Sequence, residues 1–175
     1  KINKYIQAIA MFSIVFSLFA LIYTSSYDVE YIFDRSLIRD DIGDFFKYVC
    51  FLIFIIQILI SPKYLKEKGL YIGEFYSLLI LALLGTFVII SSNNIIILYL
   101  GIELSSLSLY SLVALNKKDI FSTEASIKYF VLSIIASALI LFGFSYLYGI
   151  SGSINIHEIT SYNFEDQNYY LYLLS

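Results

Sequence analysis

One acidic residue of this sequence lies deep inside a long apolar run. Glu103 stands in the run LYLGIELSSL of residues 98–107, and a helix that begins at residue 95 would place it about 12 Å from the helix start, at a rise of about 1.5 Å per residue. Burying an unpaired charge at that depth costs at least about 2.5–3.5 kcal/mol on insertion scales. An ionisable group inside a membrane therefore indicates function by default, and we expect Glu103 to bind and release protons. The alternative is a neutral Glu103 hydrogen-bonded to a neighbouring helix.

A second ionisable residue, Lys128, lies near the start of the apolar segment 123–150. It is either a functional cation or a side chain that extends to the membrane interface, and the residues alone leave both interpretations open. Glu124 is four residues earlier, on the same helical face, in the favourable order for an ion pair. Ser122 or Thr123 could cap the start of this helix. A negative charge at a helix start also interacts favourably with the helix dipole. We expect Glu124 to support the helix start and to pair with Lys128.

Few side chains could hold a metal ion or a redox group. The sequence has one Cys, one His and one Met, whereas haem and iron–sulfur centres need sets of such ligands. Cys50 lies in an apolar run and is interpreted as a small buried hydrophobic residue. His157 has no second His or Cys near it, so a zinc site is not expected. We expect this chain to bind no metal and no cofactor.

The remaining polar and aromatic residues of the apolar segments are interpreted as structural. The 17 Tyr and 15 Phe residues are spread through loops and helices, as expected for interface anchors and packing. Small hydroxyl residues allow membrane helices to approach closely, and this role is predicted for Ser105, Ser106, Ser108, Ser111, Ser126, Ser133 and Ser137. No basic tract interrupts the chain, which argues against nucleic-acid binding.

Membrane helices must position these residues. The chain has 175 residues, of which 59% are hydrophobic and 14% charged, against about 45–50% apolar and about 25% charged in a soluble domain. Five apolar segments approach the roughly 20 residues that a membrane-spanning helix needs, and they cover residues 5–24, 45–61, 75–92, 95–115 and 123–150. The predicted fold is all-α, a single polytopic membrane domain of about five helices over residues 1–175.

Turn residues predict how these helices connect. Pro62 has no amide proton and is expected to end the second helix. The Ser-Ser-Asn-Asn sequence at 91–94 predicts a tight turn, which makes the third and fourth helices antiparallel neighbours. The tail at 151–175 is polar and then turns apolar at 169–174, as if another helix begins there.

Basic residues predict the orientation of the bundle, since short loops on the matrix or cytoplasmic side hold most of them. In a five-helix weave, one side has Lys1, Lys4, Lys63, Lys66, Lys68, Lys117 and Lys118. The other side has Arg35 and Arg39 among the acidic residues Asp28, Glu30, Asp34, Asp40 and Asp41, with Lys47 at its membrane edge. The N-terminus is therefore expected to face the matrix or the cytoplasm.

Four motifs resemble one known family. The runs GEFY (73–76), LYLGIELSSL (98–107), TEASIKYF (123–130) and LYGISGSI (147–154) occur in this order. Their order and spacing resemble the antiporter-like subunits of respiratory complex I, and are most similar to NADH dehydrogenase subunit 2, which is called subunit N in bacteria. The resemblance covers most of residues 74–156 and is weak before them.

The resemblance implies that this chain takes part in proton transfer and that other subunits bind the redox cofactors. Glu103 occupies the position of the glutamate that is a key element of the family's proton channel, and Lys128 matches a lysine on its polar membrane axis. The family implies that quinone reduction elsewhere in the complex changes the proton affinity of such residues. NADH, flavin, iron–sulfur clusters and ubiquinone would then be handled by other subunits, and this chain would hold no redox centre.

The chain departs from the family pattern at two points. Ser108 stands where a proline is common, and the later lysines of the family's channel are not in this sequence. The second departure favours a subunit 2 whose remainder is carried by a second polypeptide, or one whose ends are missing. The amino-acid composition, which is high in Ile, Tyr, Phe, Asn and Lys, is typical of an AT-rich genome. It favours the mitochondrial inner membrane over a bacterial plasma membrane.

Two other functions fit the same residues. A related cation/proton antiporter shares the glutamate motif, and sodium-dependent activity without a quinone reductase would favour it. A structural membrane fragment without pumping is the third reading, in which Glu103 serves only packing.

Overall fold

Five long helices dominate a computed structural model of the chain, which describes residues 2–24, 29–70 and 72–161, the side chains of residues 2–4 and 72 excepted. They are α1 (Ile2–Thr24), α2 (Asp41–Lys68), α3 (Ile72–Ser91), α4 (Ile95–Val113) and α5 (Ile120–Ser151). All five are long and apolar enough to cross a membrane. The predicted all-α class and its five membrane-spanning helices are therefore confirmed.

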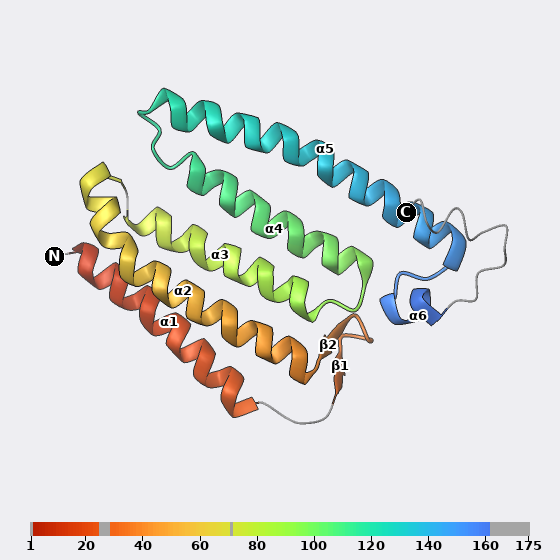
Figure 1. Ribbon diagram of the computed structural model, residues 1–175. Coiled ribbons are helices and arrows are strands. Elements are labelled where there is room, and N and C mark those ends of the chain that lie inside the picture. The colour runs from red at the N-terminus through yellow and green to blue at the C-terminus, as the bar shows by residue number, and fades with distance from the viewer. Residues whose placement is uncertain (1, 25–28, 71, 162–175) are drawn as a thin grey trace.

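Consecutive helices pack side by side in chain order, and α1 also contacts α3. Figure 1 shows this row from α1 to α5, with the short elements β1 (Glu30–Ile32), β2 (Leu37–Arg39) and α6 (Ile156–Ser161) gathered at one end. The buried core lies mainly among α1, α2 and α3, and includes Ile14, Phe51, Ile58, Leu65, Tyr76 and Leu83. Helix α5 packs on α4 at the edge of the row, so most of its surface is exposed.

The predicted end of the second helix at Pro62 is wrong. Helix α2 continues through Pro62 to Lys68 and ends at Gly69, whose φ of 62° is left-handed. Glycine adopts this conformation without a steric penalty, which suits a helix end. At its other end α2 begins at Asp41, four residues earlier than predicted, because the Asp40 side chain accepts a hydrogen bond of 2.9 Å from the amide of Gly43.

Side chains replace the hydrogen bond that Pro62 removes. A proline leaves the carbonyl four residues earlier without its helical donor, here that of Ile58. This carbonyl instead accepts from Ser61 Oγ at 3.2 Å and from Gln7 Nε2 of α1 at 3.3 Å. Tyr76 Oη of α3 lies 3.0 Å from the same Ser61 Oγ. Membrane helices tolerate proline when neighbours supply the missing partners, and these contacts also tie α1, α2 and α3 together.

Helices α3 and α4 cross where small residues meet. A Cβ atom added at Gly85 would lie 2.6 Å from the Ser105 backbone nitrogen and 3.0 Å from the Gly101 carbonyl oxygen. A Cβ atom added at Gly101 would in turn meet the backbone nitrogen of Ile89 at 3.0 Å. Such small-residue contacts allow membrane helices to approach backbone to backbone. The predicted packing role of Ser105 is consistent with this crossing.

The Ser-Ser-Asn-Asn turn between α3 and α4 also holds the short elements together. Buried Asn93 donates through Nδ2 to the carbonyl of Arg35 at 2.9 Å, and its own carbonyl accepts from the amide of Ile156 at 2.9 Å. The Asn94 side chain caps α4 by accepting from the amide of Ile96 at 2.8 Å. The predicted tight turn and the antiparallel pairing of α3 and α4 are confirmed.

The sequence did not predict the hairpin of β1 and β2. The two strands pair antiparallel in the first connection, and three residues between or beside them have positive φ: Phe33, Asp34 and Arg35. Non-glycine residues rarely adopt that conformation, so ordinary turn signals are missing. Lys1, Asp28 and the apolar stretch 169–174 lie outside the described residues.

We expect Gly85→Ala to destabilise the bundle, because the new methyl group meets backbone atoms that cannot move aside alone. Overpacking of this kind lowers the free energy of unfolding by about 1–3 kcal/mol. Thermal unfolding of the purified protein in detergent, followed by circular dichroism, measures the change. Gly149→Ala on α5 is the matched control, since its Cβ would meet nothing within 4 Å. Equal melting temperatures for the two variants would contradict the close crossing.

Ser61 and Tyr76 should be energetically coupled. Ser61→Ala removes the hydroxyl that contacts both the Ile58 carbonyl and the buried Tyr76 phenol, so the single variants should each lose stability. The double variant Ser61→Ala/Tyr76→Phe should lose less than the sum, with a coupling energy of about 0.6 kcal/mol, the average for membrane hydrogen bonds, and at most about 1.7 kcal/mol. A double-mutant cycle on unfolding in detergent measures it, and strict additivity would exclude the contact.

Candidate functional site

Glu103 lies on α4 and contacts α5. Ser137 Oγ of α5 donates a hydrogen bond to Glu103 Oε1, and Tyr99 Oη lies 3.0 Å from the same Ser137 Oγ. All three residues are half-buried. Of the serines predicted to serve packing, Ser137 is therefore the one that binds the candidate carboxyl. A bond across helices fits a proton-binding Glu103 and a structural one alike, so the geometry leaves both interpretations standing.

The two faces of α4 explain this placement. Gly101 and Ser105 face α3 at the close crossing. Residues two positions away on a helix are turned by about 200°, so Tyr99 and Glu103 point to the opposite side. These two are four residues apart and therefore lie one above the other on the face that meets α5. The packing of α4 on α3 thus directs the candidate carboxyl toward Ser137.

Lys128 pairs locally and not with Glu103. Its Nζ atom lies 2.5 Å from Glu124 Oε1, and its side chain is 70% exposed. This confirms the predicted pair. The neighbouring Tyr129 packs edge-on against Tyr110 of α4, with ring centroids 4.7 Å apart. Tyr110 is seven residues from Glu103, about 10 Å along the helix. The structure therefore places the two candidate residues at different depths.

The predicted cap of the fifth helix is corrected by the structure. Helix α5 begins at Ile120, and the Asp119 side chain caps it by accepting from the amide of Phe121 at 3.1 Å. Ser122, one of the two predicted caps, instead donates to the carbonyl of Val113 at 2.5 Å and so serves the end of α4. Thr123 donates to the carbonyl of Asp119 at 3.3 Å. Asp119 has the same capping chemistry and lies earlier in the chain, so the helix starts with it.

A buried group of three charges was missed. Asp44 of α2 accepts from Arg39 Nη2 at 3.0 Å and from Lys47 Nζ at 3.1 Å. Arg39 also donates to the carbonyl of Leu21 at the end of α1, at 3.3 Å. The side chains of Arg39, Asp44 and Lys47 are only 14%, 7% and 8% exposed. The predicted helix start at residue 45 placed Asp44 in a loop. A spacing of three residues from Lys47 predicts a side-chain contact only when both residues lie on one helix.

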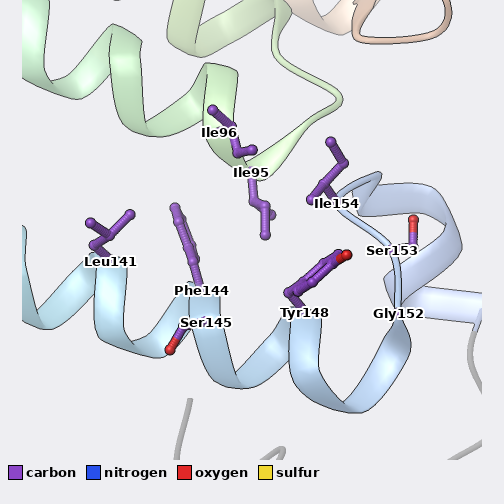
Figure 2. Close-up of a pocket in the computed structure, with 9 residues that line it drawn as sticks. All are labelled: Ile95, Ile96, Leu141, Phe144, Ser145, Tyr148, Gly152, Ser153 and Ile154. Atoms are coloured by element: carbon purple, nitrogen blue, oxygen red, sulfur yellow. The ribbon is translucent and has the colours of Figure 1, made fainter.

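An apolar groove of about 650 Å³ lies beside the start of α4. Figure 2 shows the side chains of Ile95, Leu141, Phe144, Tyr148 and Ile154 turned toward this space, whereas the Ser145 hydroxyl points away from it. Among the described residues, no group of three His, Cys, Asp or Glu side chains is close enough together to hold a metal ion. The ionisable chemistry of the described chain therefore centres on Glu103, Lys128 and the Arg39–Asp44–Lys47 group.

Sequence comparisons find relatives among the subunits of NADH-quinone oxidoreductases. A family model described as NADH:quinone oxidoreductase/Mrp antiporter, TM matches residues 92–175, which include Glu103, Lys128 and Ser137. The chain is 38% identical over 154 residues to NADH-quinone oxidoreductase subunit N of Thioalkalivibrio sulfidiphilus, covering 88% of this chain and 32% of that protein. It is 45% identical over 130 residues to subunit N of Paraburkholderia phymatum, covering 74% of this chain and 26% of that protein. The chain thus spans about a third or less of these relatives.

Solved structures share the fold. A chain of respiratory complex I from Thermus thermophilus with bound aureothin superposes with a TM-score of 0.78 at 21% identity, over 98% of this chain and 38% of that one. A chain of the membrane-bound sulfane sulfur reductase, an archaeal respiratory membrane complex, gives a TM-score of 0.79 at 24% identity, over 98% and 36% of the two chains. At these identities the likeness establishes the arrangement of helices.

We expect Asp44→Asn to destabilise the protein strongly, because it leaves two nearly buried cations without their shared anion. Removing one partner of a buried ion pair lowers the free energy of unfolding by about 3–5 kcal/mol. Thermal unfolding in detergent measures it. Asp41→Asn is the control: this exposed carboxylate in the same first turn should contribute about 1 kcal/mol or less. Similar losses in both variants would show that Asp44 acts only through the helix dipole.

Proposed function

Because this chain belongs by sequence to the antiporter-like subunit N family of NADH-quinone oxidoreductases, we propose that it is a membrane-arm subunit of such an enzyme. Its part in the enzyme is a segment of a proton translocation channel. The observation that carries this proposal is the position of the Glu103 carboxyl, in the middle of α4 and half-buried among membrane-spanning helices. A group in that position can hold a proton within the membrane and release it when its surroundings change.

Lys128 is the second ionisable group of the proposed channel. It is nine residues from Ser137 on α5, which places its charge roughly 13 Å from Glu103 along the bundle. At that separation and an effective dielectric constant of about 20, two unit charges would interact by about 1 kcal/mol. The Glu124 carboxylate beside Lys128 offsets most of that interaction, so Lys128 would act on Glu103 only when this pair opens.

The redox chemistry belongs to other subunits under this proposal. NADH, flavin, iron–sulfur clusters and ubiquinone would be bound there, while this chain contributes translocation only. Its partners would be the other membrane subunits of the enzyme. Mass spectrometry of the NADH-oxidising band from a native gel would identify them beside this chain.

The proposed location is the plasma membrane of a bacterium. The relatives named above are bacterial, which favours this membrane over the mitochondrial inner membrane that composition had suggested. The proposed orientation puts the N-terminus on the cytoplasmic side, together with Lys63, Lys66 and Lys68 in the last turns of α2. Labelling of single cysteines introduced at Lys66 and at Asp34 in a Cys50→Ser background, from each side of sealed vesicles, checks the orientation.

A cation/proton antiporter is the second candidate, because the matching family model is described jointly for oxidoreductases and Mrp antiporters. Sodium-dependent proton movement without NADH oxidation would favour it. A structural fragment without pumping is the third, and it differs from both in being indifferent to the chemistry of Glu103.

We expect Glu103→Gln to lower proton translocation coupled to NADH oxidation by at least about tenfold, since the amide cannot exchange a proton. A pH-sensitive dye in vesicles that contain the whole enzyme measures translocation, and a native gel checks assembly. Glu67→Gln, at an exposed carboxyl near the end of α2, is the control and should leave the rate unchanged. An assembled Glu103→Gln enzyme that pumps at the parental rate would support the structural alternative.

A further inference from the structure

Three oxygen atoms form a continuous chain between α4 and α5. Glu103 Oε1 contacts Ser137 Oγ, and Ser137 Oγ contacts Tyr99 Oη at 3.0 Å. Ser137 has a single O–H group but two partners, so it can donate to only one of them at a time. The direction of each hydrogen bond in this chain therefore depends on which group holds the extra proton.

Two arrangements satisfy all three groups. When Glu103 is ionised, Ser137 donates to its carboxylate and Tyr99 donates to Ser137. When Glu103 is protonated, it can donate to Ser137 Oγ, and Ser137 then donates to Tyr99 Oη. The same three side chains thus accommodate both states of Glu103 by reversing two hydrogen bonds, with no change in the position of a heavy atom.

We propose that Ser137 and Tyr99 form a hydroxyl relay that carries protons from Glu103 toward the end of the bundle at which α4 begins; this rests on the proposed function of Glu103. The carboxylic O–H bond of Glu103 breaks as its proton joins Ser137 Oγ. The Ser137 proton passes to Tyr99 Oη, and the phenolic proton of Tyr99 leaves to a water molecule. One proton leaves Glu103 and one reaches water, while both hydroxyl groups keep the same number of protons.

The position of Tyr99 gives the relay its direction. Tyr99 is one helical turn from Glu103 toward the start of α4, where Ile95 and Ile96 line the groove of about 650 Å³. The groove is also lined by residues from the C-terminal half of α5, including Tyr148 (Figure 2). Lys128 lies in the opposite direction along α5. The relay therefore leads away from Lys128, and Glu103 stands between the two.

A purely structural role for these hydroxyls makes a different prediction. If Ser137 only ties α4 to α5 through Glu103, the Tyr99 hydroxyl is dispensable, because its hydrogen bond goes to Ser137 and not to the carboxyl. If the hydroxyls relay protons, Tyr99→Phe interrupts transfer although the bond between Ser137 and Glu103 stays intact. Tyr99→Phe is for this reason the decisive variant, and it keeps the aromatic ring.

The test uses the whole enzyme in sealed vesicles, with proton translocation measured against NADH oxidation. Tyr99→Phe and Ser137→Ala should each lower translocation by about tenfold or more, whereas Ser137→Thr keeps a hydroxyl and should stay close to the parental rate. Tyr129→Phe removes a phenol hydroxyl from the same helix pair outside the relay and serves as control. The infrared carbonyl band that disappears in Glu103→Gln should shift upward in Ser137→Ala and stay in place in Tyr99→Phe.

The outcomes separate the relay from the proposed function. Parental translocation in assembled Tyr99→Phe or Ser137→Ala enzyme, combined with loss in Glu103→Gln, would overturn the relay and leave the channel role of Glu103 standing. Parental translocation in Glu103→Gln would overturn both. Loss in Glu103→Gln, Tyr99→Phe and Ser137→Ala, with Ser137→Thr and Tyr129→Phe active, is the result that the relay requires.

Discussion

Polar backbone groups inside a membrane must find their partners within the protein, because lipid offers none. Much of this structure follows from that constraint. The carbonyl of Ile58, deprived of its donor by Pro62, is shared by Ser61 and by Gln7 of another helix. At the end of the bundle, Asn94 accepts from the amide of Ile96 where α4 begins, and Asn93 donates to the carbonyl of Arg35 in the hairpin. These contacts decide how long α2 is, where α1 docks and how the hairpin and α6 are held.

The close crossing of α3 and α4 links the fold to the candidate site. Gly85 and Gly101 bring the two backbones together, and this fixes the rotation of α4 about its axis. The face that carries Tyr99 and Glu103 is then turned toward α5 and meets Ser137. Positions without a side chain thus determine where the one carboxyl in the middle of α4 points, although none of them has any acid–base chemistry.

Sequence reasoning succeeded where a local pattern decides the structure. Apolar runs predicted five spans, the four-residue spacing predicted the pair of Glu124 and Lys128, and the Asn-rich turn predicted the pairing of α3 with α4. It failed where the deciding partner is distant in the chain. Helix α2 continues through Pro62 partly because Gln7 of α1 donates to the carbonyl that the proline leaves free. Asp44 is buried because Arg39 reaches it from the hairpin. Ser137 resembles the other serines until the register of α4 against α5 is known.

That register has a consequence for access to water. Helices α4 and α5 run antiparallel, so residues that face each other have numbers with a nearly constant sum. Tyr110 faces Tyr129 and Glu103 faces Ser137, which gives a sum of about 240. Val113, the last residue of α4, is then level with a point just before Lys128. Helix α4 has 19 residues, about 28 Å at 1.5 Å per residue, which is close to the thickness of the hydrocarbon layer, about 30 Å. A hydrocarbon layer centred on α4 would therefore have Lys128 near its boundary with water and Glu103 well inside it, so a charge on Lys128 would be hydrated and one on Glu103 would not.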